Sequence, residues 1–387
     1  MTGDATEPLI PRYGDRSLAD LVPSLATALG APGFTNPLAL GPCQRAAILL
    51  VDGLGAQLLQ AHRTLAPTLA GLAGEPMTAG FPSTTATSLS SLGTGRPPGQ
   101  HGLVGYTIPV PGQPRPLNVL RWELAGPGAP VDLRETVVPE QFQPDRTAFE
   151  RLADTGVRVA LVGLPALTQS GLTRASLRGG THVAAHSLAD VVTETARVLR
   201  DPGRTLVYAY HPELDLLGHV RGVDSDAWRV HLALVDQAVA MLLERLPAGT
   251  RLVVTGDHGM VDLREADKVD LDREPQLLAG VRMVAGEPRA RHLVVAPGAV
   301  ADVLATWRER LDGHAWVLER EAAIAAGWFG PQVLDRVRAR IGDLVVAARG
   351  TAGVVQPSID GRLAELIGHH GSLTAAELLI PYATAVR

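Results

Sequence analysis

Residues 46–53 read AAILLVDG, an unbroken aliphatic run that ends in an acidic residue and a glycine. Three other short apolar runs also stop at Gly, His or Asp, and these are residues 157–162 before Gly163, residues 206–210 before His211, and residues 252–255 before Gly256-Asp257. Continuous apolar runs bounded by turn residues are typical of strands buried on both faces of a parallel sheet. The run at 46–53 therefore predicts a buried strand with Asp52 at its carboxyl end.

Longer stretches with helical spacing of apolar residues separate these runs, at residues 56–62, 148–154, 188–199 and 227–245. Strands that alternate with helices predict an α/β fold, with a doubly wound, mostly parallel sheet flanked by helices. Ligands of such sheets bind beyond the carboxyl ends of the strands. Asp52, His211 and the pair Asp257-His258 fall at those ends.

Two segments interrupt the alternation. Residues 104–141 are rich in Pro and Gly and contain short strand patterns, so we expect them to form a loop or hairpin flap over the site. Residues from 265 to about 350 contain a helical pattern near 299–310 and a return strand near 343–348. We interpret them as a small α/β cap inserted into a single catalytic domain that spans residues 1–387.

The composition excludes several classes of protein. Of 387 residues, 46% are hydrophobic and 19% charged, which is typical of a globular chain and not of a disordered one. The net charge is −5 and no polybasic tract is present, so the sequence does not indicate nucleic-acid or membrane-surface binding. No apolar stretch approaches the roughly 20 residues of a membrane helix, and the start does not resemble a secretory signal. We expect a cytoplasmic protein of undetermined oligomeric state.

Asp and His residues recur just past the predicted strands. They are Asp52, the pair Asp215 and His219 four residues apart, Asp257-His258, and His370 in the sequence GHHGS. Because Cys43 is the single cysteine, a cysteine-based zinc site is excluded. Imidazole and carboxylate ligands from separate segments are typical of catalytic zinc sites. Each residue alone is explained by a turn or a solvated side chain, but their joint occurrence predicts a metal centre.

Residues 79–102, AGFPSTTATSLSSLGTGRPPGQHG, form a Ser/Thr-rich segment with helical potential. Ser and Thr favour helix N-termini, where free backbone N–H groups attract a phosphoryl group. A hydroxyl at that position is placed to attack phosphorus if a cation lowers its pKa. The alternative is a helix of small residues packed closely on a sheet. The segment lacks the Gly-Lys-Ser/Thr ending of a phosphate-binding Walker loop, and the chain has no G-x-S-x-G motif.

In their order along the chain, these motifs resemble the alkaline phosphatase superfamily, and within it the type I phosphodiesterase and nucleotide pyrophosphatase branch. The branch combines a strand ending in Asp-Gly, a Phe-Pro-x-x-Thr segment, Thr-Gly-x-x-Pro-x-x-His-Gly, a second Asp and His, Asp-His-Gly and a final His-Gly. This chain carries them at residues 51–53, 81–85, 94–102, 215–219, 257–259 and 370–371. The likeness extends from about residue 46 to residue 370.

The resemblance implies two divalent cations, zinc by preference, although Mn²⁺ accepts similar ligands. One ion would be held by Asp215, His219 and His370, and the other by Asp52, Asp257, His258 and the Thr85 hydroxyl. Thr85 would also be the nucleophile, with Thr84 and Thr87 as alternatives. His370 is preferred over His369 because the ligand of the family directly precedes Gly.

The roles of two residues near these motifs, Tyr106 and His211, each have two possible interpretations. Members that cleave nucleotides usually carry an Asn five residues after the His of His-Gly, where it helps to hold a phosphate oxygen, and this chain has Tyr106 there. The Tyr106 hydroxyl either donates a similar hydrogen bond or packs within the flap. His211 is interpreted as a structural residue or as a support for the ligands.

The predicted reaction is an in-line displacement at phosphorus. Two cations about 4 Å apart clamp the attacking and leaving oxygens, and Thr85 forms a phosphothreonine-type intermediate. We expect a metal-dependent hydrolase that cleaves phosphodiester or pyrophosphate bonds of a small phosphate ester and loses activity in acid. The alternatives are a phosphomonoesterase or phosphonate hydrolase of the same superfamily, and a noncatalytic ligand-binding member.

Overall fold

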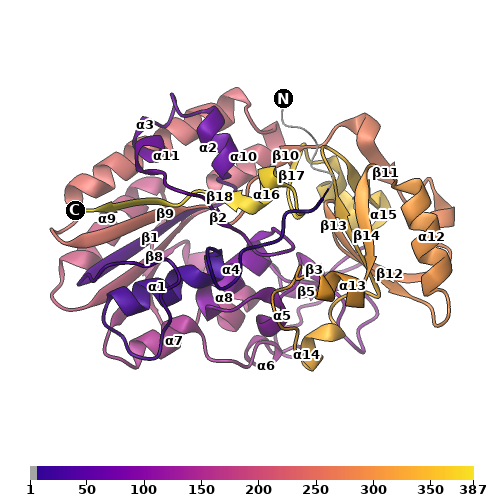
Figure 1. Cartoon of the computed structure of the whole chain (residues 1–387), viewed down its shortest axis with the longest axis horizontal. Coiled ribbons are helices and arrows are strands. Elements are labelled where there is room, and N and C mark those ends of the chain that lie inside the picture. Colours follow the sequence, from indigo (N-terminus) through magenta and orange to yellow (C-terminus); the bar gives the residue numbers. More distant parts are fainter. Residues whose placement is uncertain (1–6) are drawn as a thin grey trace.

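A six-stranded, mostly parallel sheet forms the centre of the molecule (Figure 1). The structure is a computed structural model that describes residues 7–387, so the first six residues of the expected domain lie outside it. The edge strand β19 runs antiparallel to β9, and the other neighbours are parallel. The strands, in spatial order, are β19 (Ala383–Val386), β9 (Thr250–Thr255), β1 (Arg45–Val51), β8 (Thr205–His211), β6 (Arg158–Gly163) and β7 (Thr181–Ala184).

Strand β1 shows why this sheet is buried on both faces. Its side chains alternate between two hydrophobic cores, with Ile48 and Leu50 in one and Leu49 and Val51 in the other. The first core is closed by α1 (Leu21–Ala28), α4 (Thr85–Thr94), α7 (Ala148–Ala153) and α8 (Gly171–Ser176). The second is closed by α3 (Pro67–Leu72), α9 (Leu188–Arg200) and α11 (Asp226–Arg245). Figure 1 shows α3 and α11 above the sheet and α1, α4 and α7 below it.

The fold class predicted from the sequence is confirmed. The predicted runs at 46–51, 157–162, 206–210 and 252–255 correspond to β1, β6, β8 and β9, with bounds that differ by one or two residues. The predicted helices at 56–62, 148–154, 188–199 and 227–245 correspond to α2 (Ala56–Ala61), α7, α9 and α11. The edge strands β7 and β19 were not predicted, since each has four residues and neither is a continuous buried run.

A second, four-stranded antiparallel sheet lies beside the first, at the right of Figure 1. Its strands, in spatial order, are β12 (Val281–Glu287), β13 (Ala290–Val295), β15 (Leu344–Ala348) and β14 (Ala315–Glu319). Helix α12 (Val300–Arg310) packs on it through the buried indole of Trp307. The sheet falls within the segment expected to form a cap, and the boundaries of that cap stay a prediction.

The segment expected to form a flap contains a small antiparallel sheet of β3 (Thr107–Ile108), β4 (Leu117–Asn118) and β5 (Glu123–Leu124). It is tied to the second sheet through Thr107, whose hydroxyl donates to the Gly286 carbonyl at 2.9 Å and accepts from the Gly286 N–H at 2.7 Å. The limits 104–141 of the flap also stay a prediction.

Short elements complete the described chain. Three two-stranded sheets pair β10 (Val261–Asp262) with β17 (Gly368–His369), β11 (Lys268–Asp270) with β16 (Gly353–Val355), and β18 (Leu379–Ile380) with β2 (Met77–Thr78). The remaining helices are α5 (Pro98–His101), α6 (Pro139–Phe142), α10 (Glu213–Arg221), α13 (Arg320–Ala325), α14 (Asp335–Arg338), α15 (Pro357–Asp360) and α16 (Ala375–Leu378).

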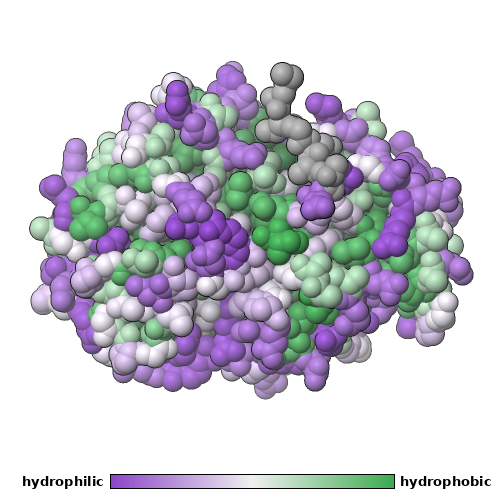
Figure 2. Space-filling model, viewed as in Figure 1, coloured by the Kyte–Doolittle hydropathy of each residue, from purple (hydrophilic) through white to green (hydrophobic). Residues whose placement is uncertain are grey.

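The visible face of the molecule in Figure 2 alternates polar side chains with smaller hydrophobic areas. Among residues 7–387, no helix combines the length and the apolar character that crossing a bilayer requires.

A buried histidine joins the second sheet to the segment before the flap. His292 of β13 donates from Nε2 to the Val104 carbonyl at 2.8 Å, and its Nδ1 accepts from the Gly342 N–H at 3.3 Å. These two partners fit only the neutral ring, because a proton on Nδ1 would face the Gly342 N–H. Burial lowers the pKa of His292 to about 4, from its usual 6.5.

This histidine predicts a loss of stability in acid. Between pH 6.5 and 4 the unfolded chain holds a proton on His292 that the folded chain does not hold, so the free energy of unfolding falls as the pH falls. The loss from this group reaches about 3 kcal/mol near pH 4. We expect His292→Gln, which can keep the hydrogen bond from the Nε2 position to the Val104 carbonyl and does not titrate, to reduce the dependence of the unfolding free energy on pH, measured by denaturant titrations, over this range. His314→Gln, at an exposed position, is the control, and an equal pH dependence for the two variants would contradict the prediction.

Candidate metal centre

The carboxyl ends of three neighbouring strands bring the predicted ligands together. Asp52 directly follows β1, and Asp257 and His258 follow β9 after one glycine. Helix α10 begins two residues after β8 and carries Asp215 and His219 on its first two turns. Because β8, β1 and β9 are adjacent and parallel, these segments leave the sheet at one edge.

Gly53 permits the close approach of two of these segments. Its φ of +74° favours glycine, and a Cβ built there would lie 2.9 Å from the Cα of Asp215. The Gly53 N–H also donates to Asp257 Oδ1 at 3.1 Å. Any larger residue at position 53 would therefore push the Asp215 segment away from Asp52 and Asp257.

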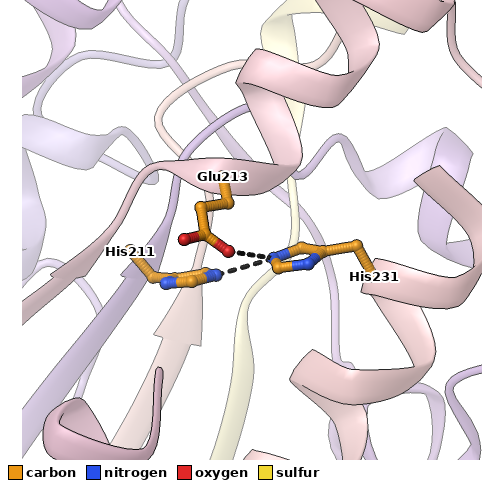
Figure 3. Close-up of side chains that lie close together, drawn as sticks. All are labelled: His211, Glu213 and His231. Carbon is orange, nitrogen blue, oxygen red and sulfur yellow. Dashed lines mark hydrogen bonds and ion pairs between the residues drawn. The ribbon is translucent and has the colours of Figure 1, made fainter. Parts of the chain in front are cut away.

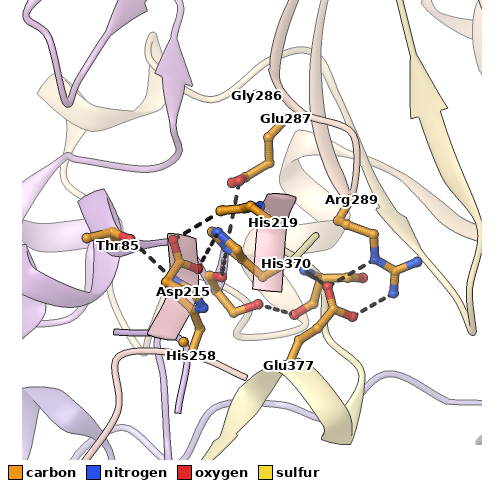
Figure 4. A network of polar contacts seen from close by, with 12 residues as sticks. Thr85, Asp215, His219, His258, Gly286, Glu287, Arg289, His370 and Glu377 are labelled. Atoms are coloured by element: carbon orange, nitrogen blue, oxygen red, sulfur yellow. Dashed lines mark hydrogen bonds and ion pairs between the residues drawn. The ribbon is translucent and has the colours of Figure 1, made fainter. Parts of the chain in front are cut away.

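The six Asp and His side chains predicted as ligands form two adjoining groups. Asp52, Asp257 and His258 make one group, and Asp215, His219 and His370 make the other, each with its ligand atoms within 4.8 Å of one another. The groups meet where the rings of His258 and His370 stack, with centroids 3.5 Å apart (Figure 4). The structure thus brings together residues that lie up to 318 positions apart in the sequence, from Asp52 to His370.

The three histidines of these groups are oriented in the same way by backbone carbonyls. Nδ1 of His219 lies 2.7 Å from the Gly368 oxygen, Nδ1 of His258 lies 3.0 Å from the Gly259 oxygen, and Nδ1 of His370 lies 2.9 Å from the Ser83 oxygen. Each Nδ1 is therefore a proton donor, and each Nε2 presents its lone pair to the carboxylates in the neutral ring. This is the arrangement that proteins use to orient histidine ligands of a metal.

The charges of the two groups are those of a candidate cation site. Burial raises the pKa of Asp257 well above its usual range, and the neighbouring Asp52 carboxylate raises it further. Burial by itself would lower the pKa of His258. Three nearby carboxylates outweigh this effect and raise that pKa to about 10, and they belong to Asp257, Asp52 and Asp215. Oδ2 of Asp257 and Oδ1 of Asp215 are inaccessible to solvent and have no hydrogen-bond partner among the described residues. The donor set and its unpartnered oxygens fit two divalent cations of the kind that zinc exemplifies.

The hydroxyl of Thr85, the first residue of α4, faces the first group. Its Oγ1 lies 3.2 Å from His258 Nε2 and 3.5 Å from Asp52 Oδ1. The neighbouring Thr84 side chain instead hydrogen-bonds Glu287. The Thr87 hydroxyl is buried without a hydrogen-bond partner in the described part of the chain. Of the three threonines considered from the sequence, Thr85 has the contacts that a nucleophile of this centre requires.

Comparison with known families agrees with this geometry. The sequence model of the family described as type I phosphodiesterase / nucleotide pyrophosphatase matches residues 46–373. The chain belongs to this family. The phosphodiesterase family lies within the alkaline phosphatase superfamily, so the resemblance found in the sequence motifs is confirmed, and the chain is a hydrolase of that family.

Solved structures of similar fold include relatives from animals and bacteria. Murine ectonucleotide pyrophosphatase/phosphodiesterase 5 in complex with AMP has 18% identity and a TM-score of 0.62, over 88% of this chain and 87% of that chain. The human protein of the same name has 16% identity and a TM-score of 0.63, over 88% and 87%. Phosphonoacetate hydrolase from Sinorhizobium meliloti 1021, in complex with phosphonoacetate, has 19% identity and a TM-score of 0.63, over 88% and 90%. No curated protein matches the sequence.

In this phosphodiesterase family member, the side chains of Tyr106 and His369 make hydrogen bonds outside the two ligand groups. The Tyr106 hydroxyl accepts from the Asn118 amide at 2.9 Å inside the flap, and its side chain lines a separate pocket with Arg291 and Asp360. The catalytic role predicted for Tyr106 therefore stays a prediction. His369 directs Nε2 to the Leu366 carbonyl at 3.1 Å, whereas His370 belongs to the second ligand group.

Two residues near the centre were missed by the sequence analysis. Tyr210 of β8 donates a hydrogen bond from its hydroxyl to Asp52 Oδ2. The buried carboxyl of Glu287, at the end of β12, lies 3.9 Å from His370 Nδ1, and burial raises its pKa to about 8. Tyr210 could have been found from its place at the end of a predicted strand. No sequence signal marked Glu287, which comes from the second sheet.

An apolar pocket of about 360 Å³ adjoins the centre. It shares Asp52 and Asp215 with the two ligand groups, and Thr85 also lines it. Most of its other walls are aliphatic. They come from α4, the end of β6 and the segment from the end of β6 to just after α8: Leu89, Leu161, Val162, Leu164, Leu167, Leu172 and Leu177. The pocket therefore offers a hydrophobic surface next to the Thr85 hydroxyl.

The charge balance predicts that metal stabilises the fold. Zinc should raise the melting temperature and EDTA should lower it, because a ligand that binds the folded state at 1,000 times its Kd adds about 4 kcal/mol. Asp257→Asn keeps the shape of the side chain and removes one negative charge, so we expect lower metal content and a smaller response to zinc. Asp236→Asn, at a buried aspartate bonded to the Leu69 N–H, is the control. An undiminished zinc response in Asp257→Asn would contradict the assignment.

Proposed function

We propose that this phosphodiesterase family member hydrolyses phosphodiester or pyrophosphate bonds, with Thr85 as the nucleophile and with two divalent cations, zinc by preference. The observation that carries the proposal is the convergence of three Nε2 lone pairs and three carboxylates beside the Thr85 hydroxyl. Asp52, Asp257 and His258 would hold one cation, and Asp215, His219 and His370 the other. When bound, two such ions neutralise the attacking and leaving oxygens of an in-line displacement.

The proposed reaction has two steps, and Thr85 carries the phosphoryl group between them. Thr85 gives its hydroxyl proton to solvent water, and its oxygen bonds to phosphorus while the bond from phosphorus to the leaving oxygen breaks. The leaving oxygen takes a proton from solvent and departs as an alcohol or a phosphate. Water then attacks the phosphothreonine at phosphorus, and the Thr85 oxygen leaves and regains its proton. The free backbone N–H groups at the start of α4 would bind the equatorial oxygens.

The first test compares substrate classes on the purified protein. We expect bis-p-nitrophenyl phosphate to be cleaved faster than p-nitrophenyl phosphate, with loss of turnover in EDTA and recovery in zinc. Faster cleavage of the monoester would instead support a phosphomonoesterase, and phosphate release from phosphonoacetate a phosphonate hydrolase. Absence of turnover with all three would indicate a ligand-binding member and overturn the proposal.

Variants of the three threonines test the nucleophile in the same assay. Thr85→Ala should lower kcat by about a thousandfold or more, since it removes the attacking atom, while bound zinc stays close to the wild-type amount. Thr85→Ser should keep measurable turnover because it retains a hydroxyl. Thr84→Ala and Thr87→Ala are the matched controls from the same segment. If Thr85→Ala kept turnover and one of the controls lost it, the nucleophile would be reassigned.

The apolar pocket favours diesters whose retained ester group, the one that stays bound to phosphorus through oxygen, is hydrophobic. Aliphatic walls bind an aryl or alkyl group by removing it from water, and they offer few partners to a charged one. A diester whose retained group fills the pocket should therefore be preferred over one with a methyl group there. The leaving group of the two substrates is kept the same in this comparison.

A charge placed in the pocket should remove that preference. Leu167 lines the pocket and is 39% exposed, so Leu167→Asp is tolerated by the fold. We expect it to lower kcat/KM for bis-p-nitrophenyl phosphate about tenfold, equivalent to about 1.4 kcal/mol, with little effect on methyl p-nitrophenyl phosphate. Leu234→Asp, on the exposed face of α11, is the control. An equal loss for both substrates would exclude the pocket as the site of the retained group.

A further inference from the structure

A third group of metal-ligating side chains lies outside the two groups described above. His211 ends β8, Glu213 begins α10, and His231 lies on α11. One ligand atom from each lies within 4.8 Å of the others (Figure 3). His211 and His231 are buried, whereas the side chain of Glu213 is 55% exposed, so the group is open to solvent on the side of Glu213.

The contacts within this group converge on the Nε2 atoms. His211 Nε2 and His231 Nε2 are 2.7 Å apart, and Oε2 of Glu213 is 3.7 Å from His231 Nε2. The two rings are nearly parallel, at 13°, with centroids 5.0 Å apart. A hydrogen bond between two Nε2 atoms requires that one of them carry no proton. The lone pair of that nitrogen points at the other Nε2, and release of the proton between them would leave both lone pairs available to a metal ion.

The spacing fits a single tetrahedral ion. With zinc–nitrogen distances of about 2.0 to 2.1 Å, ligand atoms around a tetrahedral ion lie about 3.3 Å from one another. The observed separations of 2.7 and 3.7 Å lie on either side of that value, so a small shift of the rings would admit the ion. Two imidazoles and one carboxylate are a ligand set that zinc uses, with water at the fourth position.

We propose that His211, Glu213 and His231 bind a third divalent transition-metal ion, with zinc as the probe ion. The site would join the end of β8, the start of α10 and α11. Helix α10 also carries Asp215 and His219, and the His211 carbonyl accepts from the Asp52 N–H at 2.9 Å. An ion here is a positioning element for the segments that present those ligands, and it does not touch the substrate.

Anomalous diffraction at the zinc edge tests the site directly. Full-length protein is loaded with zinc, dialysed against zinc-free buffer and crystallised. We expect an anomalous peak bounded by His211, Glu213 and His231. His231→Gln should lack this peak and contain about one zinc fewer per chain, because glutamine can keep the hydrogen bond to His211 but is a poor zinc ligand. His186→Gln, at an exposed histidine outside the group, is the control and should retain the peak.

Thermal unfolding gives a second measurement that separates a metal site from a histidine pair. Without metal, wild type and His231→Gln should melt at similar temperatures because the hydrogen bond is retained, and zinc should raise the melting temperature less in the variant. Absence of the peak after dialysis, or equal zinc content and equal zinc response in both proteins, would overturn the proposal. The site does not depend on the proposed hydrolase: its peak can be present when turnover or the other ions are absent.

Discussion

The structure depends on carboxylates that are held close together at one edge of a sheet. Asp52, Asp215 and Asp257 come from three segments, and the first and last of them are almost completely buried. Charges of like sign in such a place are unfavourable unless cations compensate them. The unpartnered oxygens of Asp257 and Asp215 and the raised pKa of His258 are both consequences of this one constraint. A pair of divalent ions held by these ligands would relieve that repulsion.

The surrounding chain fixes the geometry on which that compensation depends. The carbonyls of Ser83, Gly259 and Gly368 orient the three imidazoles, and they belong to the segment before α4, the loop after β9 and strand β17. Gly53 lets the Asp215 segment approach without a side chain in between. Tyr210 supports Asp52 from the neighbouring strand. Because backbone carbonyls orient the histidines, the residues that supply these carbonyls need no particular side chain. Short motifs around the ligands are therefore enough to identify the centre in the sequence.

A buried ion pair joins the second sheet to the loop that carries His370. Arg289, in the turn between β12 and β13, contacts both carboxylate oxygens of Glu377, at 3.0 and 2.6 Å, and neither side chain is exposed (Figure 4). Glu377 also accepts from the Ser372 N–H at 3.0 Å, two residues after His370. Removing one partner of such a pair leaves an uncompensated buried charge, which is strongly destabilising. The position of His370 is therefore tied to the second sheet, which also contributes Glu287.

The sequence by itself determined the buried strands, the principal helices and the order of the ligand motifs. These features are local, because a few neighbouring residues are enough to recognise an apolar run such as 46–51 as a strand, or a His-Gly pair as part of a motif. Only the tertiary structure showed that Thr85, and not Thr84 or Thr87, faces the first ligand group. For His370, which the following glycine already favoured over His369, it supplies the physical reason. Neighbouring side chains of extended chain point to opposite sides, so His370 enters the cluster while His369 turns to Leu366. Glu287 and His231 were beyond prediction because their partners come from distant segments, and a contact between distant segments leaves no local pattern.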